Sequence, residues 1–239
     1  MIARTLLLAW SLTSTWAAAE ELRVAVAANF RDAYVEVQDL YQQQTGVRPD
    51  AVFGSSGMLY AQITQGAPFH LFLSADRERP LQLDAAGLAA SRVATYARGR
   101  LALWMPNRTA SPDVLPGKRF ALANPRLAPY GTAARTCLER LGLWQANQGN
   151  AVYGNNVSQT FHFVASGAVD AGFVAYAQLL GRNVPAREIW LAPDTCYEPI
   201  EQGIVVLKSN TEPEAARFMT FLLNDEVRER LEELGYARP

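Results

Sequence analysis

Residues 22–46 read LRVAVAANFRDAYVEVQDLYQQQTG, and this stretch determines the expected class of fold. Residues 22–27 form a short apolar run, which is typical of a buried strand. Residues 30–44 carry apolar positions at helical spacing, and Gly46 is a typical helix end. A buried strand followed directly by a helix is the basic unit of an α/β protein with parallel strands.

The same alternation of apolar runs and helical patterns continues along most of the chain. It predicts an α/β fold with mainly parallel sheets and helices on both faces of each sheet. We expect strands at 22–27, 47–53, 71–74, 100–105, 120–123, 152, 171–174 and 204–207, and helices at 30–44, 57–65, 79–86, 132–141, 158–166, 213–223 and 225–234.

Two changes in the pattern predict a division into two lobes. The composition shifts around residues 98–100, which suits a crossover into a second lobe, and residues 208–210 suit a return. We therefore expect one lobe from residues 20–98 plus 209–239 and the other from residues 99–208. A chain that leaves a lobe and comes back makes two linked halves, and the cleft between such halves is a preferred ligand site.

Residues 1–19 have the layout of a secretory signal peptide. Arg4 supplies a positive charge, residues 6–10 an apolar run, and Ala17-Ala18-Ala19 a small-residue cleavage site. No later segment reaches the roughly eighteen apolar residues that a membrane-spanning helix needs. We therefore expect an exported, soluble, periplasmic protein. The formal net charge of −1 and the lack of a basic run argue against nucleic acid as a partner.

The chain has two cysteines, Cys137 and Cys196, which both fall in the expected second lobe. In an oxidising compartment such a pair is expected to form a disulfide, and two separate buried thiols are the alternative. Two cysteines and two histidines at no tight spacing make a poor metal site. We therefore expect no metal held directly by protein side chains.

Four of the expected strand-to-helix junctions share one chemistry. Each lies immediately before a helix and is small, polar or glycine-bearing. Helix N-termini have unpaired N–H groups and the positive end of the helix dipole, and in parallel sheets they lie on one edge. Any one junction is explained equally well by an ordinary helix cap. Together the four favour a charge-free cage of donors for an anion, built from residues 28–30, 54–57, 128–131 and 155–158.

Several short strings closely resemble periplasmic molybdate-binding proteins. The resemblance follows the order of the chain over nearly its whole expected mature length, and as a set the strings are specific. It implies a two-lobed periplasmic-binding-protein fold of type II that delivers molybdate or tungstate to the permease of an ABC importer, without a cofactor. The strings are GSSG at 54–57, QI through GAP at 62–68, LSAD at 73–76, ANP at 123–125, APYG at 128–131, NVSQ at 156–159 and GFVA at 172–175.

The resemblance also implies which residues contact the anion. Carried over by position, they are Asn29, Ser56, Tyr130 and Val157, with the backbone amide of Ala28 as a further candidate. The Ala-Asn-Phe sequence at 28–30 resembles a subgroup that also tends to have Tyr at position 130. Members with Ser at position 29 use a Tyr near position 175 instead, so the resemblance leaves a contact from Tyr176 open.

The proposed donors suit an oxyanion that carries no proton. Molybdate and tungstate are fully deprotonated at neutral pH and only accept hydrogen bonds, so burying them requires a donor for every oxygen. Phosphate carries a proton near neutrality and would need an acceptor for it, typically a carboxylate. None of the four junctions places a carboxylate next to its donor residue. Sulfate is also free of protons, so only the size of the cage would exclude it.

Other functions remain as alternatives. A binding protein for another oxyanion or a small organic acid has the same general features, although carboxylate ligands usually meet an Arg fork. A secreted hydrolase is less well supported, because the sequence has no nucleophile-elbow, Walker or zinc-protease motif and both histidines, His70 and His162, lie in apolar runs. A sensory module would require an additional domain. We expect a monomeric binding protein without enzymatic activity.

Overall fold

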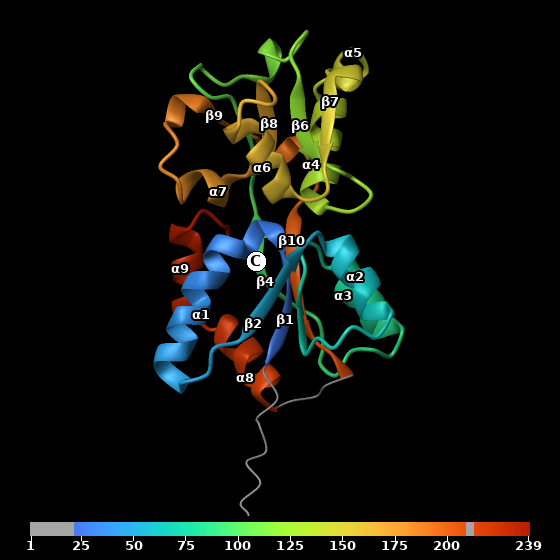
Figure 1. Cartoon of the computed structure of the whole chain (residues 1–239), viewed down its shortest axis with the longest axis vertical. Coiled ribbons are helices and arrows are strands. Elements are labelled where there is room, and N and C mark those ends of the chain that lie inside the picture. Colours follow the sequence, from blue (N-terminus) through green and yellow to red (C-terminus); the bar gives the residue numbers. More distant parts are fainter. Residues whose placement is uncertain (1–21, 209–212) are drawn as a thin grey trace, which may run out of the picture.

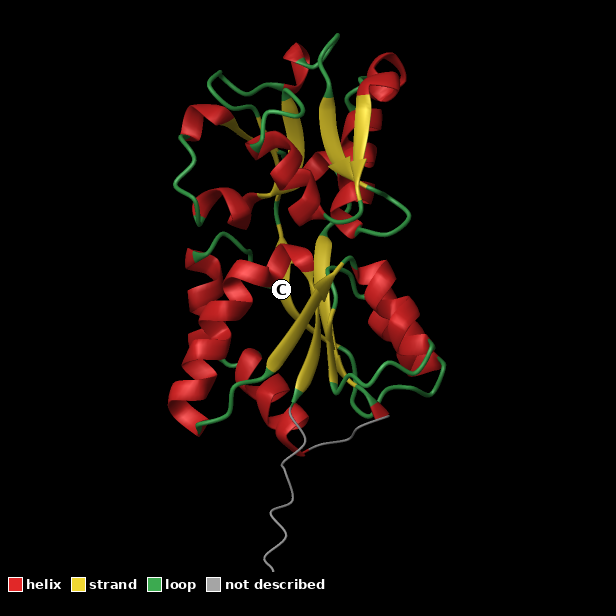
Figure 2. Cartoon of the chain, in the orientation of Figure 1, coloured by secondary structure: helices red, strands yellow, loops and turns green. Residues whose placement is uncertain are grey.

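The computed structural model describes residues 22–208 and 213–239, so the expected signal peptide at residues 1–19 lies outside the described residues. Two five-stranded sheets with flanking helices form two lobes, which lie one above the other in Figures 1 and 2. The strand order is β2-β1-β3-β10-β4 in the first lobe and β7-β6-β8-β5-β9 in the second. Within the described residues, no helix is long and apolar enough to cross a membrane.

The first lobe joins the N-terminal and C-terminal parts of the chain. Its strands are β1 (Arg23–Ala27), β2 (Asp50–Gly54), β3 (Leu71–Leu73), β4 (Ala94–Gly99) and β10 (Ile200–Val206). Its helices are the 3-10 turn η1 (Ala28–Phe30), α1 (Arg31–Thr45), α2 (Ser56–Thr64), α3 (Glu78–Ala85), α8 (Pro213–Leu222) and α9 (Asp225–Glu233).

The second lobe is formed by the middle of the chain. Its strands are β5 (Leu101–Trp104), β6 (Phe120–Ala123), β7 (Ala151–Gly154), β8 (Ala171–Ala175) and β9 (Ile189–Leu191). Its helices are α4 (Pro129–Arg140), α5 (Trp144–Asn147), α6 (Val157–Ala165) and α7 (Tyr176–Leu180), with short 3-10 turns that include η5 (Asp194–Cys196).

The central strands β1 and β3 are buried on both faces, which explains why residues 24–27 and 71–73 are continuous apolar runs. Successive residues of a strand point to opposite faces. Val24 and Val26 accordingly pack in one cluster with α1, α8 and α9, whereas Ala25 packs in another with α2 and α3. Figure 2 shows these two groups of helices on either side of the first sheet.

The chain passes between the lobes twice, as the two-lobed prediction requires. The first passage runs from Gly99 at the end of β4 to Leu101 at the start of β5. The prediction that the second lobe extends to residue 208 is wrong, because β10 pairs with β3 and β4 of the first sheet. The second passage therefore lies between η5 and Ile200. Gln202 and Gly203 interrupt the apolar pattern of β10, so the sequence pattern predicted only its second half as a strand.

The two-lobed α/β architecture is confirmed, but its sheets are more mixed than the alternation predicted. In each lobe one strand pairs in parallel on both sides, β1 with β2 and β3 in the first lobe and β6 with β7 and β8 in the second. The strands next to the passages pair antiparallel, β10 with β3 and β4 in one lobe and β5 with β8 and β9 in the other. A strand that enters or leaves a lobe directly has no crossover helix to restore a parallel direction.

Cys137 of α4 and Cys196 of η5 form a disulfide, with Cα atoms 4.4 Å apart. Both residues are buried in the apolar core of the second lobe. The bond ties the helix that follows the 128–131 junction to the segment that leads back into β10. It therefore links one wall of the inter-lobe junction to one of the two passages.

Loss of this disulfide should destabilise the protein. The bond closes a loop with a sequence separation of 59 residues, and loss of such a cross-link typically lowers the free energy of unfolding by about 2–4 kcal/mol. Urea unfolding of the wild type and of the Cys137→Ser/Cys196→Ser variant would measure the difference. Reduced wild type serves as the control and should match the variant. Equal stability of the oxidised and reduced proteins would contradict the expectation.

Candidate functional site

Four strand-to-helix junctions, two from each lobe, line one small cavity. They are the segments at the ends of β1 and β2 and at the starts of α4 and α6. The cavity has a volume of about 10 Å³ for the centre of a water molecule, which is roughly the minimum that holds one water. The lining residues are Ala27, Ala28, Asn29, Gly54, Ser55, Ser56, Ala75, Ala128, Pro129, Tyr130, Asn156 and Val157.

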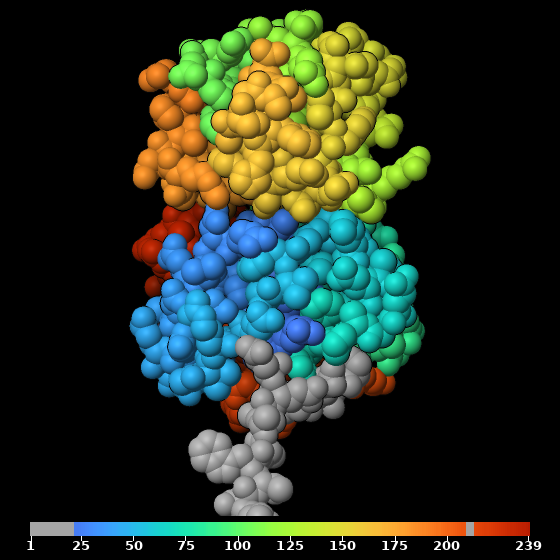
Figure 3. Space-filling model, viewed as in Figure 1, coloured from blue at the N-terminus to red at the C-terminus, as the bar shows by residue number. Residues whose placement is uncertain are grey.

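The cavity is enclosed because the lobes touch around it. The Gly57 amide of the first lobe donates to the Leu127 carbonyl of the second, with N and O 2.9 Å apart. From the second lobe, the Ser158 hydroxyl donates to the Ala28 carbonyl at 3.0 Å. In the space-filling view the two lobes meet along the face shown (Figure 3). Residues that enclose the cavity are consequently almost fully buried, with exposed fractions of 1–4% for Ala28, Asn29, Ser56, Tyr130 and Val157.

Local sequence explains why Ser56 is available to the cavity. The neighbouring Ser55, not Ser56, is the cap of α2, because its side chain accepts from the Met58 amide. Asn156 caps α6 in the same way by accepting from the Gln159 amide at 2.9 Å. Ser56 and Val157 are thus the first residues of their helices, and their amides have no partner within the helix.

The Ser56 hydroxyl is arranged as a hydrogen-bond donor. Its Oγ accepts from the Ala75 amide, which follows β3, at 2.9 Å. A hydroxyl whose oxygen already accepts a hydrogen bond keeps its own hydrogen for another acceptor. Ala75 lies at the carboxyl end of a strand, on the sheet edge that carries the other junctions, and it falls in the LSAD string at 73–76.

Asn29 is held from two sides. Its side-chain Nδ2 donates to Gln202 Oε1 of β10 at 3.0 Å, and its backbone carbonyl accepts from the Tyr236 hydroxyl at 2.8 Å. These contacts fix both the backbone and the side chain of the 28–30 junction. Neither Gln202 nor Tyr236 was a predicted site residue, because both act from elements far away in sequence.

Tyr130 brings a phenol to the same place. Gly131 permits this, because a Cβ there would lie 2.1 Å from the Ala123 carbonyl oxygen, so only glycine lets the start of α4 approach β6 so closely. Burial raises the pKa of the Tyr130 hydroxyl well above its ordinary value. Tyr130 therefore stays neutral and keeps its hydrogen at physiological pH.

The cavity lining holds donors but no charge. Among the residues that the structure describes, those that line it include no Lys, Arg, His, Asp or Glu. The described part of the chain also has no group of three or more His, Cys, Asp or Glu side chains that could hold a metal ion. Three helix N-termini, two hydroxyls and one amide group suit a small anion held without a counter-charge.

The structure thus brings together every residue that the resemblance implicated, namely Asn29, Ser56, Tyr130, Val157 and Ala28. Tyr176 is not among the residues that line the cavity. It starts α7, and the Arg100 guanidinium lies 4.9 Å from the centre of its ring. Ser55 and Asn156 line the cavity through their roles as helix caps.

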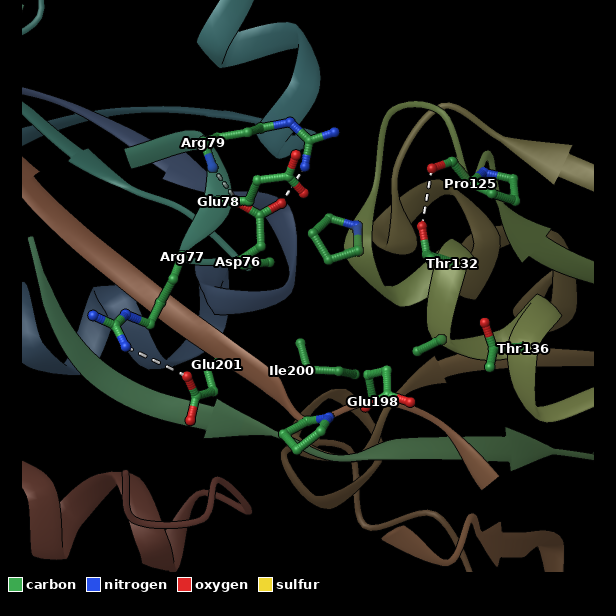
Figure 4. A pocket seen from close by; sticks show the side chains of 14 residues that line it. Asp76, Arg77, Glu78, Arg79, Pro125, Thr132, Thr136, Glu198, Ile200 and Glu201 are labelled. Atoms are coloured by element: carbon green, nitrogen blue, oxygen red, sulfur yellow. Dashed lines mark hydrogen bonds and ion pairs between the residues drawn. The ribbon is translucent and has the colours of Figure 1, made fainter. Parts of the chain in front are cut away.

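A larger groove also lies between the lobes, but it offers little to an anion. It has a volume of about 670 Å³, and both arginines that line it from the first lobe are paired with carboxylates. Figure 4 shows Arg79 beside Asp76 and Arg77 beside Glu201. Because its positive charges are already compensated, the small cavity is the stronger candidate.

Comparison with known proteins agrees with this site. The family described as "Bacterial extracellular solute-binding protein" matches residues 22–237. The "Molybdate-binding protein ModA" of Rhodobacter capsulatus is 39% identical over 92% of this chain and 90% of its own length, and that of Azotobacter vinelandii is 36% identical over 92% and 91%.

The solved structure of the "Azotobacter vinelandii periplasmic molybdate-binding protein" superposes with a TM-score of 0.85 at 37% identity. The match covers 92% of this chain and all of that one. A match over nearly the whole chain, with two lobes and an enclosed cavity between them, identifies the architecture as well as the sequence family. The chain belongs to the bacterial extracellular solute-binding proteins and is similar to molybdate-binding members among them.

Proposed function

We propose that this protein captures molybdate or tungstate in the periplasm and delivers it to the membrane permease of an ABC importer. It acts as a monomer, carries no cofactor and converts no substrate. The main observation in support is the enclosed cavity, which presents donors from both lobes and no charged side chain. Its relatives at 36–39% identity are named for molybdate binding.

The chemistry of the cavity argues against the other candidates. A small organic acid would favour an Arg side chain, and the described lining has none. A hydrolase would need a nucleophile with an adjacent base, whereas the two hydroxyls that are not helix caps, on Ser56 and Tyr130, have no base beside them in the described lining.

Titration with a panel of oxyanions tests the proposal directly. We expect calorimetry to detect tight binding of molybdate and tungstate, weaker binding of sulfate and the weakest binding of phosphate. The reason is that a cage of donors satisfies a proton-free dianion and leaves the phosphate proton without an acceptor. Phosphate that binds as tightly as molybdate would refute the proposal.

Replacing Ser56 by Ala should weaken molybdate binding by at least about tenfold. The substitution removes one hydrogen bond to a charged group, a loss of roughly 1.5–3 kcal/mol. Val157→Ala is the matched control, because Val157 would contribute its backbone amide, which the substitution keeps. Titration calorimetry of both variants makes the comparison. Equal losses would mean that side-chain packing, and not donor geometry, determines affinity.

Molybdate affinity should be nearly constant from about pH 6 to pH 8. The raised pKa of Tyr130 means that its hydroxyl keeps the proton throughout this range and beyond it. The other proposed donors do not titrate, and the ligand remains a dianion. Dissociation constants measured at intervals of half a pH unit would check this. A steep change inside the window would point to a titrating ligand or side chain and against molybdate.

A further inference from the structure

Gln202 is a buried polar side chain close to the cavity, in a position that no sequence pattern marks. It lies on β10, has an exposed fraction of 0% and does not line the cavity itself. Its Oε1 accepts two hydrogen bonds, one from Asn29 Nδ2 at 3.0 Å and one from the Tyr96 hydroxyl at 2.8 Å. Burying an amide is unfavourable unless its groups are paired, so its presence here requires an explanation.

A β-bulge brings Tyr96 to Gln202. Gln202 is paired with Ala97 and Gly203 with Thr95, so Tyr96 is an extra residue in β4. In a regular ladder Tyr96 would face away from the side on which Ala97 and Gln202 lie. Bulges redirect side chains in this way and are frequent next to functional sites. The β-bulge therefore allows the Tyr96 hydroxyl to reach Gln202.

The two donors also determine the orientation of the Gln202 amide. Its Nε2 has no hydrogen-bond partner among the described residues. A Cβ on Gly99 would lie 3.1 Å from this nitrogen and 2.2 Å from the Tyr130 hydroxyl oxygen, so Gln202 and Tyr130 are close neighbours. An unpaired buried donor is unfavourable, yet turning the amide over would place its nitrogen against the nitrogen of Asn29.

The orientation of Gln202 determines the orientation of the Asn29 amide. The Asn29 nitrogen carries two hydrogens, and one of them goes to Gln202 Oε1. Asn29 lines the cavity, so its second hydrogen is available to an acceptor bound there.

We propose that Gln202 is a positioning residue that, by accepting one hydrogen of Asn29 Nδ2, keeps the other hydrogen directed at the bound anion. This inference rests on the proposed function. Without an acceptor at position 202, the Asn29 amide is free to turn over and present its oxygen to the cavity. The cage then loses a donor.

A double-mutant cycle tests this role with sodium molybdate as the probe. Gln202→Met keeps the length of the side chain and removes the acceptor. It should weaken binding about tenfold in the wild-type background, as expected for one lost hydrogen bond to a charged group, and less than about twofold in an Asn29→Ala background. A purely structural role would give the same loss in both backgrounds and would overturn the proposal.

Gln38→Met is the matched control, because Gln38 is also a buried glutamine of the first lobe, and it bonds the Pro49 carbonyl away from the cavity. It should lower thermal stability and leave molybdate affinity unchanged. An equal loss of affinity in this control would also overturn the positioning role.

If Gln202→Met does not fold, Tyr96→Phe replaces it in the double-mutant cycle with Asn29→Ala. This variant removes only one of the two donors to Gln202, so we expect a smaller loss that again disappears in the Asn29→Ala background. Persistence of the loss there would contradict the role of Gln202. Wild type that binds no molybdate would refute the proposed function itself, which distinguishes that failure from a failure of the positioning role.

Discussion

A backbone amide that is buried away from water must find a hydrogen-bond acceptor, and this requirement governs the junction between the two lobes. The helices α2, α4 and α6 all begin there, and the first amides of a helix have no acceptor within it. Some are satisfied by Ser55 and Asn156 as caps, and one by the Leu127 carbonyl of the opposite lobe. The remaining amides, those of Ser56 and Val157, border a cavity whose described lining has no charged side chain. A ligand that accepts hydrogen bonds would satisfy them.

The hydroxyls of the cavity follow the same logic as the amides. Ser56 Oγ already accepts from the Ala75 amide, and burial raises the pKa of Tyr130 so that its hydroxyl keeps the proton. Hydroxyl groups normally adapt to donors and acceptors alike, but here each is left with a hydrogen to give. A site of this kind distinguishes ligands by their protons as well as by their shape, and it does so without any charged side chain.

Short-range sequence patterns were sufficient to predict two lobes and the four junctions that meet at the cavity. Each junction is encoded locally, by an apolar strand, a small or polar turn and a helix, whereas the family resemblance was needed to single out Asn29 and Ser56. Long-range features were not predictable in this way. The antiparallel return of β10 depends on partners about 100 residues away, and Gln202 and Gly203 break the apolar pattern that would have revealed the strand. The anion-binding roles of the cavity residues remain predictions.

The contact between Gly57 and Leu127 has a mechanical consequence. It joins backbone to backbone across the lobes, and a Cβ on Gly57 would lie 2.9 Å from the Leu127 oxygen, which is too close for any side chain. The spacing of the lobes at this rim therefore depends on the absence of a side chain at position 57, and any residue larger than glycine there would wedge the cavity open.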